Sequence, residues 1–235
     1  MLGLATGCLP ASLAVVAQVF EEHCGVRFQV LRRGLSPKRY LFIHGDEYTA
    51  FDVLTKFMSA HDGVAYLTTG KERNIELSGA KIDPNRMWSR VGAEKSLRAQ
   101  NSVVTDEKIA AVLQFLDDER QEMIDRLTPG RGSRLVALHN NRDYSVQDEV
   151  AASDAVSIRQ PDKPRYFFLC TKAADFAILK RSPYNVVLQT KPDPDDGSLS
   201  RLAARRGFRY INLECAIYDE KAQRERLEWL ERNLS

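Results

Sequence analysis

The stretch Leu41-Phe42-Ile43-His44-Gly45-Asp46-Glu47 is the most informative part of this sequence. Residues 40–43 form an apolar run that predicts a buried strand, and residues 48–59 predict a helix. His44 and Glu47 therefore stand where a strand passes into a helix, and there their side chains can converge on one point. Zinc binds imidazole nitrogen and carboxylate oxygen, and a catalytic zinc keeps three protein ligands and one open position. The motif supplies two such ligands; the alternative is a buried histidine bonded to a neighbouring carboxylate.

Two later strands also end in residues that can bind a metal ion or accept a proton. Residues 135–138 predict a buried strand that ends in His139, and residues 210–213 predict another that ends in Glu214. Ligands gather at the carboxyl ends of strands in open α/β sheets. With the two ligands above, His139 completes a two-histidine, one-carboxylate metal set. Glu214 is a candidate general base; the alternative is a glutamate that merely lies at the rim of the sheet.

The stretch Asp83-Pro84-Asn85-Arg86 offers a group that binds anions. Pro84 restricts Asp83 to extended geometry, so these residues cannot lie inside a helix. Asn85 and Arg86 are therefore presented from a loop, and an arginine fork matches a carboxylate with two hydrogen bonds. The alternative is a surface arginine that caps a turn.

The composition is that of an ordinary globular protein. The chain has 235 residues, enough for one large α/β domain, and a net charge of +2. This balance gives no electrostatic reason to expect a nucleic-acid partner. The sequence has no Cys-x-x-Cys motif, which argues against a zinc site built from thiolates. We assign residues 26–235 to a single catalytic domain.

Residues 1–25 allow two interpretations. Residues 1–20 contain no Lys, Arg, Asp or Glu, but Gly3, Gly7 and Pro10 break the apolar run, so we expect no stable membrane insertion. The segment is either signal-like, with cleavage after residues 15–17, or a first helix over residues 11–22. A signal peptide would make the protein periplasmic or secreted, and a helix would make it cytoplasmic.

The remaining elements follow from apolar periodicity and from turn residues. Residues 90–105 are polar and poorly patterned and predict a loop, as do residues 150–164. Further strands are predicted at residues 26–31, 64–68, 165–171 and 185–189, and helices at residues 105–128, 173–181, 199–206 and 222–234.

Taken together, four ordered motifs resemble the zinc carboxypeptidase superfamily, which includes carboxypeptidase A and the aspartoacylase/succinylglutamate desuccinylase branch. The motifs are His44-x-x-Glu47, Asn85-Arg86, His139 and Glu214. His44-Gly45-Asp46-Glu47 is similar to the His-Gly-Asn-Glu of the second branch, and Asp83-Pro84-Asn85-Arg86 is similar to the Asp-x-Asn-Arg of both. The resemblance covers roughly residues 38–218. It implies a three-layer α/β/α fold with a mixed central sheet.

The resemblance also implies how the metal site would work. His44, Glu47 and His139 would hold zinc, and Glu214 would be the general base that takes a proton from the attacking water.

On the substrate side, Arg86, helped by Asn85, would grip a carboxylate. Arg73 resembles the family arginine that polarises the scissile carbonyl. The family's mobile tyrosine has no clear counterpart, and Tyr218 is the candidate.

These roles predict a zinc-dependent hydrolase that cleaves an amide bond next to a free carboxylate. A metallocarboxypeptidase that acts on small peptides, on cell-wall peptides if the chain is exported, is the leading hypothesis. An N-acyl amino acid deacylase of the aspartoacylase/succinylglutamate desuccinylase type is the alternative. A catalytically silent relative that only binds a peptide would not need a general base at Glu214, and a structural domain without a site would require four coincidences.

Overall fold

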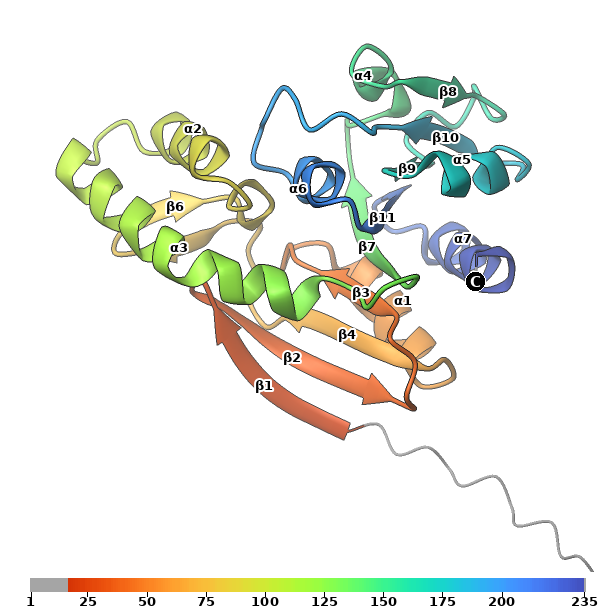
Figure 1. The fold of residues 1–235 in the computed structure, drawn as a ribbon, viewed down its shortest axis with the longest axis horizontal. Coiled ribbons are helices and arrows are strands. Elements are labelled where there is room, and N and C mark those ends of the chain that lie inside the picture. Colours follow the sequence, from red (N-terminus) through yellow and green to blue (C-terminus); the bar gives the residue numbers. More distant parts are fainter. Residues whose placement is uncertain (1–16, 235) are drawn as a thin grey trace, which may run out of the picture.

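The computed structural model describes residues 17–234, and a nine-stranded mixed sheet runs through it (Figure 1). The strands lie in the order β1-β2-β4-β3-β7-β11-β9-β10-β8. In chain order they are β1 (Ala17–His23), β2 (Val26–Arg33), β3 (Arg39–Phe42), β4 (Gly63–Thr68), β7 (Arg134–Asn141), β8 (Ala155–Ser157), β9 (Phe167–Cys170), β10 (Asn185–Leu188) and β11 (Arg209–Ala216).

Helices cover both faces of this sheet, which confirms an α/β fold with a mixed central sheet. On one face lie α1 (Tyr48–Met58), α5 (Ala173–Leu179) and α7 (Glu220–Asn233), whose buried residues share one apolar cluster. On the other lie α2 (Arg90–Gln100), α3 (Asp106–Leu127) and α6 (Leu199–Arg206), which share the second cluster. A short helix, α4 (Val146–Val150), follows β7. The two clusters are separated by the alternation of side chains along each strand.

The centre of the sheet is parallel, and this places the candidate site. β4, β3, β7 and β11 pair in parallel, so their carboxyl ends lie at one edge. Strand β9 is antiparallel to β11, and β1 and β2 extend the other side as an antiparallel hairpin. The residues that close β3, β7 and β11 therefore meet at the same edge of the sheet.

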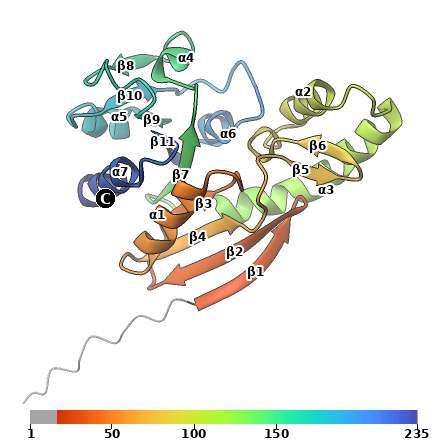
Figure 2. The same cartoon turned by 180° about the vertical axis from the view of Figure 1, so that it is seen from behind.

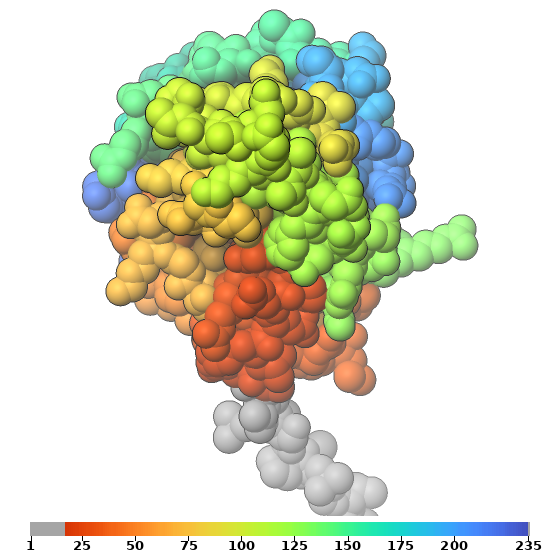
Figure 3. All heavy atoms as spheres, turned by 90° about the vertical axis from the view of Figure 1, so that its left-hand side faces the viewer, coloured from red at the N-terminus to blue at the C-terminus, as the bar shows by residue number. Residues whose placement is uncertain are grey.

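Residues 75–127 form a lobe beside the sheet (Figure 2). It contains the two-stranded sheet of β5 (Ile75–Leu77) and β6 (Ala80–Ile82), the 3₁₀ helix η1 (Pro84–Arg86), and helices α2 and α3. Figure 3 shows this part of the chain, in yellow and green, packed against the red β1–β2 hairpin.

Helix α2 corrects the loop predicted at residues 90–105. Ser89 caps it by accepting a hydrogen bond from the backbone of Gly92, and Ala93 and Leu97 pack into the core. Ala93 and Leu97 lie one helical turn apart and are the only pair of large or small apolar side chains that α2 buries. The segment therefore lacks the repeated apolar periodicity that predicts a helix. The predicted loop at 150–164 is also interrupted, by the edge strand β8.

The amino-terminal helix predicted over residues 11–22 is wrong where the structure describes it. Residues 17–23 form β1, which pairs with β2 in an antiparallel register from Ala17 opposite Arg32 to His23 opposite Val26. Residues 1–16, which include most of the predicted signal-like segment and the start of the predicted helix, lie outside the described residues. Pairing with a long neighbouring strand outweighs a local preference for helix, since strand propensity depends on context.

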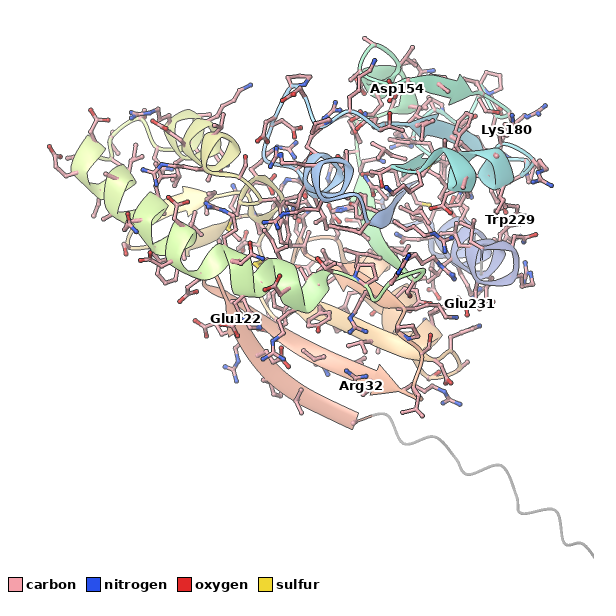
Figure 4. The ribbon with its side chains drawn as sticks, in the orientation of Figure 1. Arg32, Glu122, Asp154, Lys180, Trp229 and Glu231 are labelled. Atoms are coloured by element: carbon pink, nitrogen blue, oxygen red, sulfur yellow. The ribbon has the colours of Figure 1, made fainter. Side chains whose placement is uncertain are left out.

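Helix α7 is fastened to the sheet by a buried ion pair. Arg134 of β7 donates to Glu231 over 2.7 Å and to the carbonyl of Leu234, and the hydroxyl of Tyr40 also donates to Glu231. Figure 4 labels Trp229 and Glu231 on this helix. In residues 17–234, no helix is both long and apolar enough to cross a membrane.

Candidate metal and substrate site

Three side chains that the sequence singled out as metal ligands lie together at the carboxyl edge of the parallel strands. Candidate ligand atoms of His44, Glu47 and His139 all lie within 4.8 Å of one another, and the residues are 1%, 3% and 4% exposed. Each histidine directs its Nδ1 to a different oxygen of Glu47, at 2.9 Å for His44 and 3.2 Å for His139. The group could therefore hold a metal ion.

The turn between β3 and α1 fixes His44 and Glu47. A Cβ on Gly45 would lie 2.3 Å from the carbonyl oxygen of Gly70, and the Gly45 amide donates to the carbonyl of Glu72. Only glycine permits this close approach of two backbone segments. Glu47 then precedes the first turn of α1 and accepts the amide of Ala50.

Asp83 orients His44 from the side opposite Glu47. Its Oδ1 lies 2.9 Å from His44 Nε2 and also accepts the Asn85 amide at 2.7 Å. Pro84 holds the Asp83 backbone extended, with φ −72° and ψ 119°, as predicted, but Asn85 and Arg86 follow in the short 3₁₀ helix η1 and not in the predicted loop. A carboxylate on the second ring nitrogen fixes the tautomer of a metal-binding histidine and makes the first nitrogen a stronger ligand. The sequence does not reveal this role of Asp83, because its partner His44 lies 39 positions away.

The charges in this cluster stabilise one another. Burial alone would lower the pKa of His44, but the charge of Glu47 and the hydrogen bond to Asp83 outweigh it and raise the pKa to about 9. Burial would raise the pKa of Glu47, but His139 and His44 lower it to about 2. Without a metal ion, His44 and Glu47 therefore form a buried ion pair at neutral pH.

Arg73 reaches the same cluster from the loop before β5. Its guanidinium lies 3.2 Å from Glu47 Oε1 and 3.4 Å from Asp83 Oδ2, and its side chain is 49% exposed. Arg73 thus borders both the ligand group and open solvent. It stands where it can meet the oxygen of a ligand that enters the cavity.

Glu214 faces His139 across the parallel pair of β11 and β7, at the same register position. Its two oxygens accept hydrogen bonds from the side-chain amides of Asn141, at 3.0 Å, and Asn212, at 3.1 Å. Burial raises the pKa of Glu214, although His139 opposes the shift. A carboxylate with a raised pKa is suited to exchange protons near neutral pH. The sequence did not reveal the two asparagines, since they sit inside strands without a motif.

All seven predicted site residues line one cavity of about 460 Å³. Asn85 uses Oδ1 to accept the indole N–H of Trp88 and the amide of Leu199, both at 3.2 Å. Within residues 17–234, the guanidinium of Arg86 donates one hydrogen bond, to the carbonyl of Asn85 at 3.0 Å, and no carboxylate pairs with it. The cavity therefore has metal-ligand chemistry on one side and an unpaired guanidinium on another. Its other lining residues are Asp46, Asn140, Asn141, Arg142, Asp143, Tyr144, Glu149, Leu169, Gln189, Asp196, Ser198, Ser200, Arg201, Tyr210, Asn212 and Ile217.

Tyr218, the candidate for the family's mobile tyrosine, is 76% exposed and does not line the cavity. Two other tyrosines do, Tyr144 and Tyr210. Tyr144 donates its hydroxyl to Glu149, and Tyr210 is buried within β11.

The donor set fits a catalytic zinc: two imidazoles and one carboxylate, with a carboxylate behind one imidazole and a cavity in front. Neither the known protein-family models nor the curated proteins give a match to this chain. The chemistry of the cavity is therefore the basis for the functional assignment.

Proposed function

We propose that this protein is a zinc-dependent hydrolase that cleaves an amide bond next to a free carboxylate, as its resemblance to the zinc carboxypeptidases suggests. The single observation that carries the proposal is the composition of the cavity. A buried His44-Glu47-His139 group, the carboxylate of Glu214 and the unpaired guanidinium of Arg86 line the same space. An amide hydrolase that recognises a terminal carboxylate needs these three functions.

When bound by His44, Glu47 and His139, zinc would act as a Lewis acid and lower the pKa of water. Glu214 takes the proton of the attacking water and later gives it to the leaving amine. Asn141 and Asn212 hold both carboxylate oxygens during this exchange, so the base stays aligned with the cavity.

Arg73 and Arg86 have different roles toward the substrate. Arg73, already beside Glu47, stabilises the negative charge that develops on the scissile carbonyl oxygen. Arg86 binds the free carboxylate and thereby fixes which amide bond lies next to the base. Because no carboxylate of residues 17–234 pairs with the guanidinium, a substrate carboxylate supplies a charge-assisted hydrogen bond that water alone replaces poorly.

The test compares dipeptides that carry a free or an amidated carboxyl terminus, with the purified protein and added zinc. Amidation should reduce kcat/KM by roughly 10- to 100-fold, because it leaves Arg86 without its charged partner. Equal turnover of both forms would remove Arg86 from substrate recognition. N-acyl amino acids, assayed in parallel, separate a deacylase from a carboxypeptidase.

Glu214→Gln tests the chemistry separately from the metal. The amide keeps the shape and cannot accept the proton, so kcat should fall by ~10²- to 10⁴-fold while zinc content stays unchanged. Glu122→Gln, on the outer surface of α3 (Figure 4), is the matched control. Binding of free-acid substrates without turnover by the wild-type protein would identify a silent, peptide-binding relative.

A further inference from the structure

Three arginines are buried in residues 17–234, and one of them lines a second cavity that shares no lining residue with the first. Arg134 pairs with Glu231, and Arg201 lines the cavity already described. Arg226 of α7 is 3% exposed, and no carboxylate of residues 17–234 forms an ion pair with it. Burial of a charge costs free energy unless an opposite charge compensates it, so this guanidinium favours the binding of an anion.

Two tyrosine rings hold the guanidinium of Arg226. Its Cζ lies 5.0 Å from the ring centroid of Tyr166 and 4.5 Å from that of Tyr184, and such contacts offset part of the cost of burial. Nη1 donates to the carbonyl of Ala222 and Nη2 to Oε1 of Gln160, both at 3.0 Å, whereas the buried Nε has no hydrogen-bond partner within residues 17–234. A guanidinium has five N–H donors in one plane, so donors remain for the oxygens of a ligand.

A buried asparagine fixes the wall of this cavity opposite α7. Asn185 of β10 is 0% exposed, and its Oδ1 accepts the amide of Gln160 at 2.8 Å. Its Nδ2 donates to three carbonyls of the same segment, those of Gln160, Lys163 and Tyr166, at 2.9, 3.0 and 3.2 Å. The segment that faces Arg226 is therefore held in place by a strand of the central sheet.

Positive charge exceeds negative charge around the cavity, which has a volume of about 230 Å³. Its charged side chains are those of Lys163, Lys221 and Arg226 against those of Asp219 and Glu225, a net charge of +1. The amino-terminal end of α7 also borders it, and a helix amino terminus favours anions. The volume lies below the ~300 to 1,000 Å³ of sites for larger ligands, so the cavity suits a small anion.

The two carboxylates that line the cavity do not neutralise Arg226. Asp219 caps α7 with Oδ1 and accepts the hydroxyl of Tyr166 with Oδ2 at 2.9 Å. Glu225 lies 4.0 Å from the ammonium of Lys221. Lys163 likewise forms no ion pair with a carboxylate of residues 17–234. Two positive charges of the cavity are therefore uncompensated in this part of the chain.

We propose that this cavity binds phosphate, either free inorganic phosphate or the phosphate group of a small molecule. Phosphate groups carry about −1.5 to −2 charges at neutral pH, which matches the uncompensated charges of Arg226 and Lys163 better than a carboxylate does. Arg226 donates to phosphate oxygens in the plane of its fork, and Lys163 adds a point charge. The site takes no part in bond cleavage, and the proposal does not depend on the proposed function.

The test is an NMR titration of the zinc-loaded, isotope-labelled protein with inorganic phosphate at constant pH and ionic strength. Phosphate can also enter the first cavity, so the dissociation constant is taken from the backbone amides of residues 160–166 and 219–226. These amides should shift in a saturable way, and their dissociation constant should be the same in Arg86→Gln, which alters the first cavity alone.

Substitutions at the cavity give the expected size of the effect. Arg226→Gln should weaken phosphate binding at these amides by roughly 10- to 100-fold, because it removes a charged donor. Arg226→Lys should keep part of the affinity, since it keeps the charge and loses the planar fork. Lys180→Gln is the control and should keep the wild-type affinity, because this exposed lysine at the end of α5 (Figure 4) does not line the cavity.

A second variant guards against loss of the fold, which thermal unfolding measures for each protein. Lys163 is exposed, so Lys163→Gln removes a charge from the cavity without disturbing the core. It should weaken phosphate binding by roughly 2- to 5-fold. A loss of the same size in Lys180→Gln would show that only the general surface charge attracts phosphate, and would overturn the site.

Further ligands identify the anion. Tighter binding of phenyl phosphate than of inorganic phosphate at the same amides would support a phosphorylated small molecule as the natural ligand, and the reverse order would support free phosphate. Acetate that binds as tightly as phosphate would overturn the preference for phosphate. The site itself would be overturned by the absence of saturable shifts, by shifts that Arg86→Gln removes, or by shifts that Arg226→Gln leaves unchanged.

Discussion

Replacement of Asp83 by asparagine should weaken metal binding without removing a ligand. The Oδ1 of Asp83 lies 2.9 Å from His44 Nε2, and both residues are buried, so water screens this contact little. Asparagine can still accept the imidazole N–H and the Asn85 amide, and it caps η1 as aspartate does. The substitution therefore removes mainly the negative charge behind the imidazole.

The expected size of the effect follows from that single contact. Loss of a partner that orients a metal-binding histidine typically lowers metal affinity by about 10- to 100-fold, or ~1.4 to 2.7 kcal/mol. Arg73, which bonds to Asp83 Oδ2 at 3.4 Å, keeps its contact with Glu47, so we expect no larger loss.

A competition titration against a chromogenic zinc chelator at constant pH measures the dissociation constants. Asp143→Asn removes the same charge from an exposed residue that also lines the cavity, and it controls for the general electrostatic effect. If Asp83→Asn and Asp143→Asn bind zinc with the same affinity as the wild type, Asp83 does not act through His44.

Three other predictions concern the metal and the stability of the fold. His139→Ala should sharply lower the zinc content from about one ion per chain, because two protein ligands hold zinc poorly, and metal analysis of the purified variant checks this. The pKa of His44, raised to about 9 by Glu47 and Asp83, means that zinc must displace a proton. Zinc affinity should therefore rise by about tenfold per pH unit between about pH 6 and 8, and a pH-independent affinity would contradict this. Arg134→Ala should lower the free energy of unfolding by about 3 kcal/mol in urea titrations, because it breaks a buried ion pair, whereas the exposed Arg232→Ala should have little effect.

The side chains whose convergence at one edge of the sheet could be predicted from the sequence are those with a local signal. His44, His139 and Glu214 each close an apolar run, and parallel strands bring such ends to one edge. The strand-to-helix turn before Tyr48 was predictable for the same reason. The mixed sheet and its two helical layers agree with the α/β prediction, while the closer likeness to a zinc carboxypeptidase fold stays a prediction.

The errors arose where pairing between distant segments decides the structure. Residues 17–22 are free of charge until Glu21 and look like part of a helix, but β2 offers them a complete antiparallel partner. Residues 90–100 look polar, but Ala93 and Leu97 are enough to hold α2 against α3. Both segments show tertiary contacts overriding local propensity.

Asp83 and Arg201 show why the residues around the metal-ligand group are harder to predict from the sequence than the ligands themselves. Asp83 stands in a motif, but the role proposed for it depends on its contact with His44, which only the folded chain brings within 2.9 Å. Arg201 stands in a basic helix with Arg205 and Arg206, a pattern typical of a solvated face, and Arg205 indeed pairs with Asp195 at the surface. Only burial distinguishes Arg201 from these neighbours, and burial depends on the contact between the start of α6 and Asn85. The position of Arg201 in this cavity therefore depends on packing between two segments more than 100 positions apart, 114 in the case of Leu199 and Asn85.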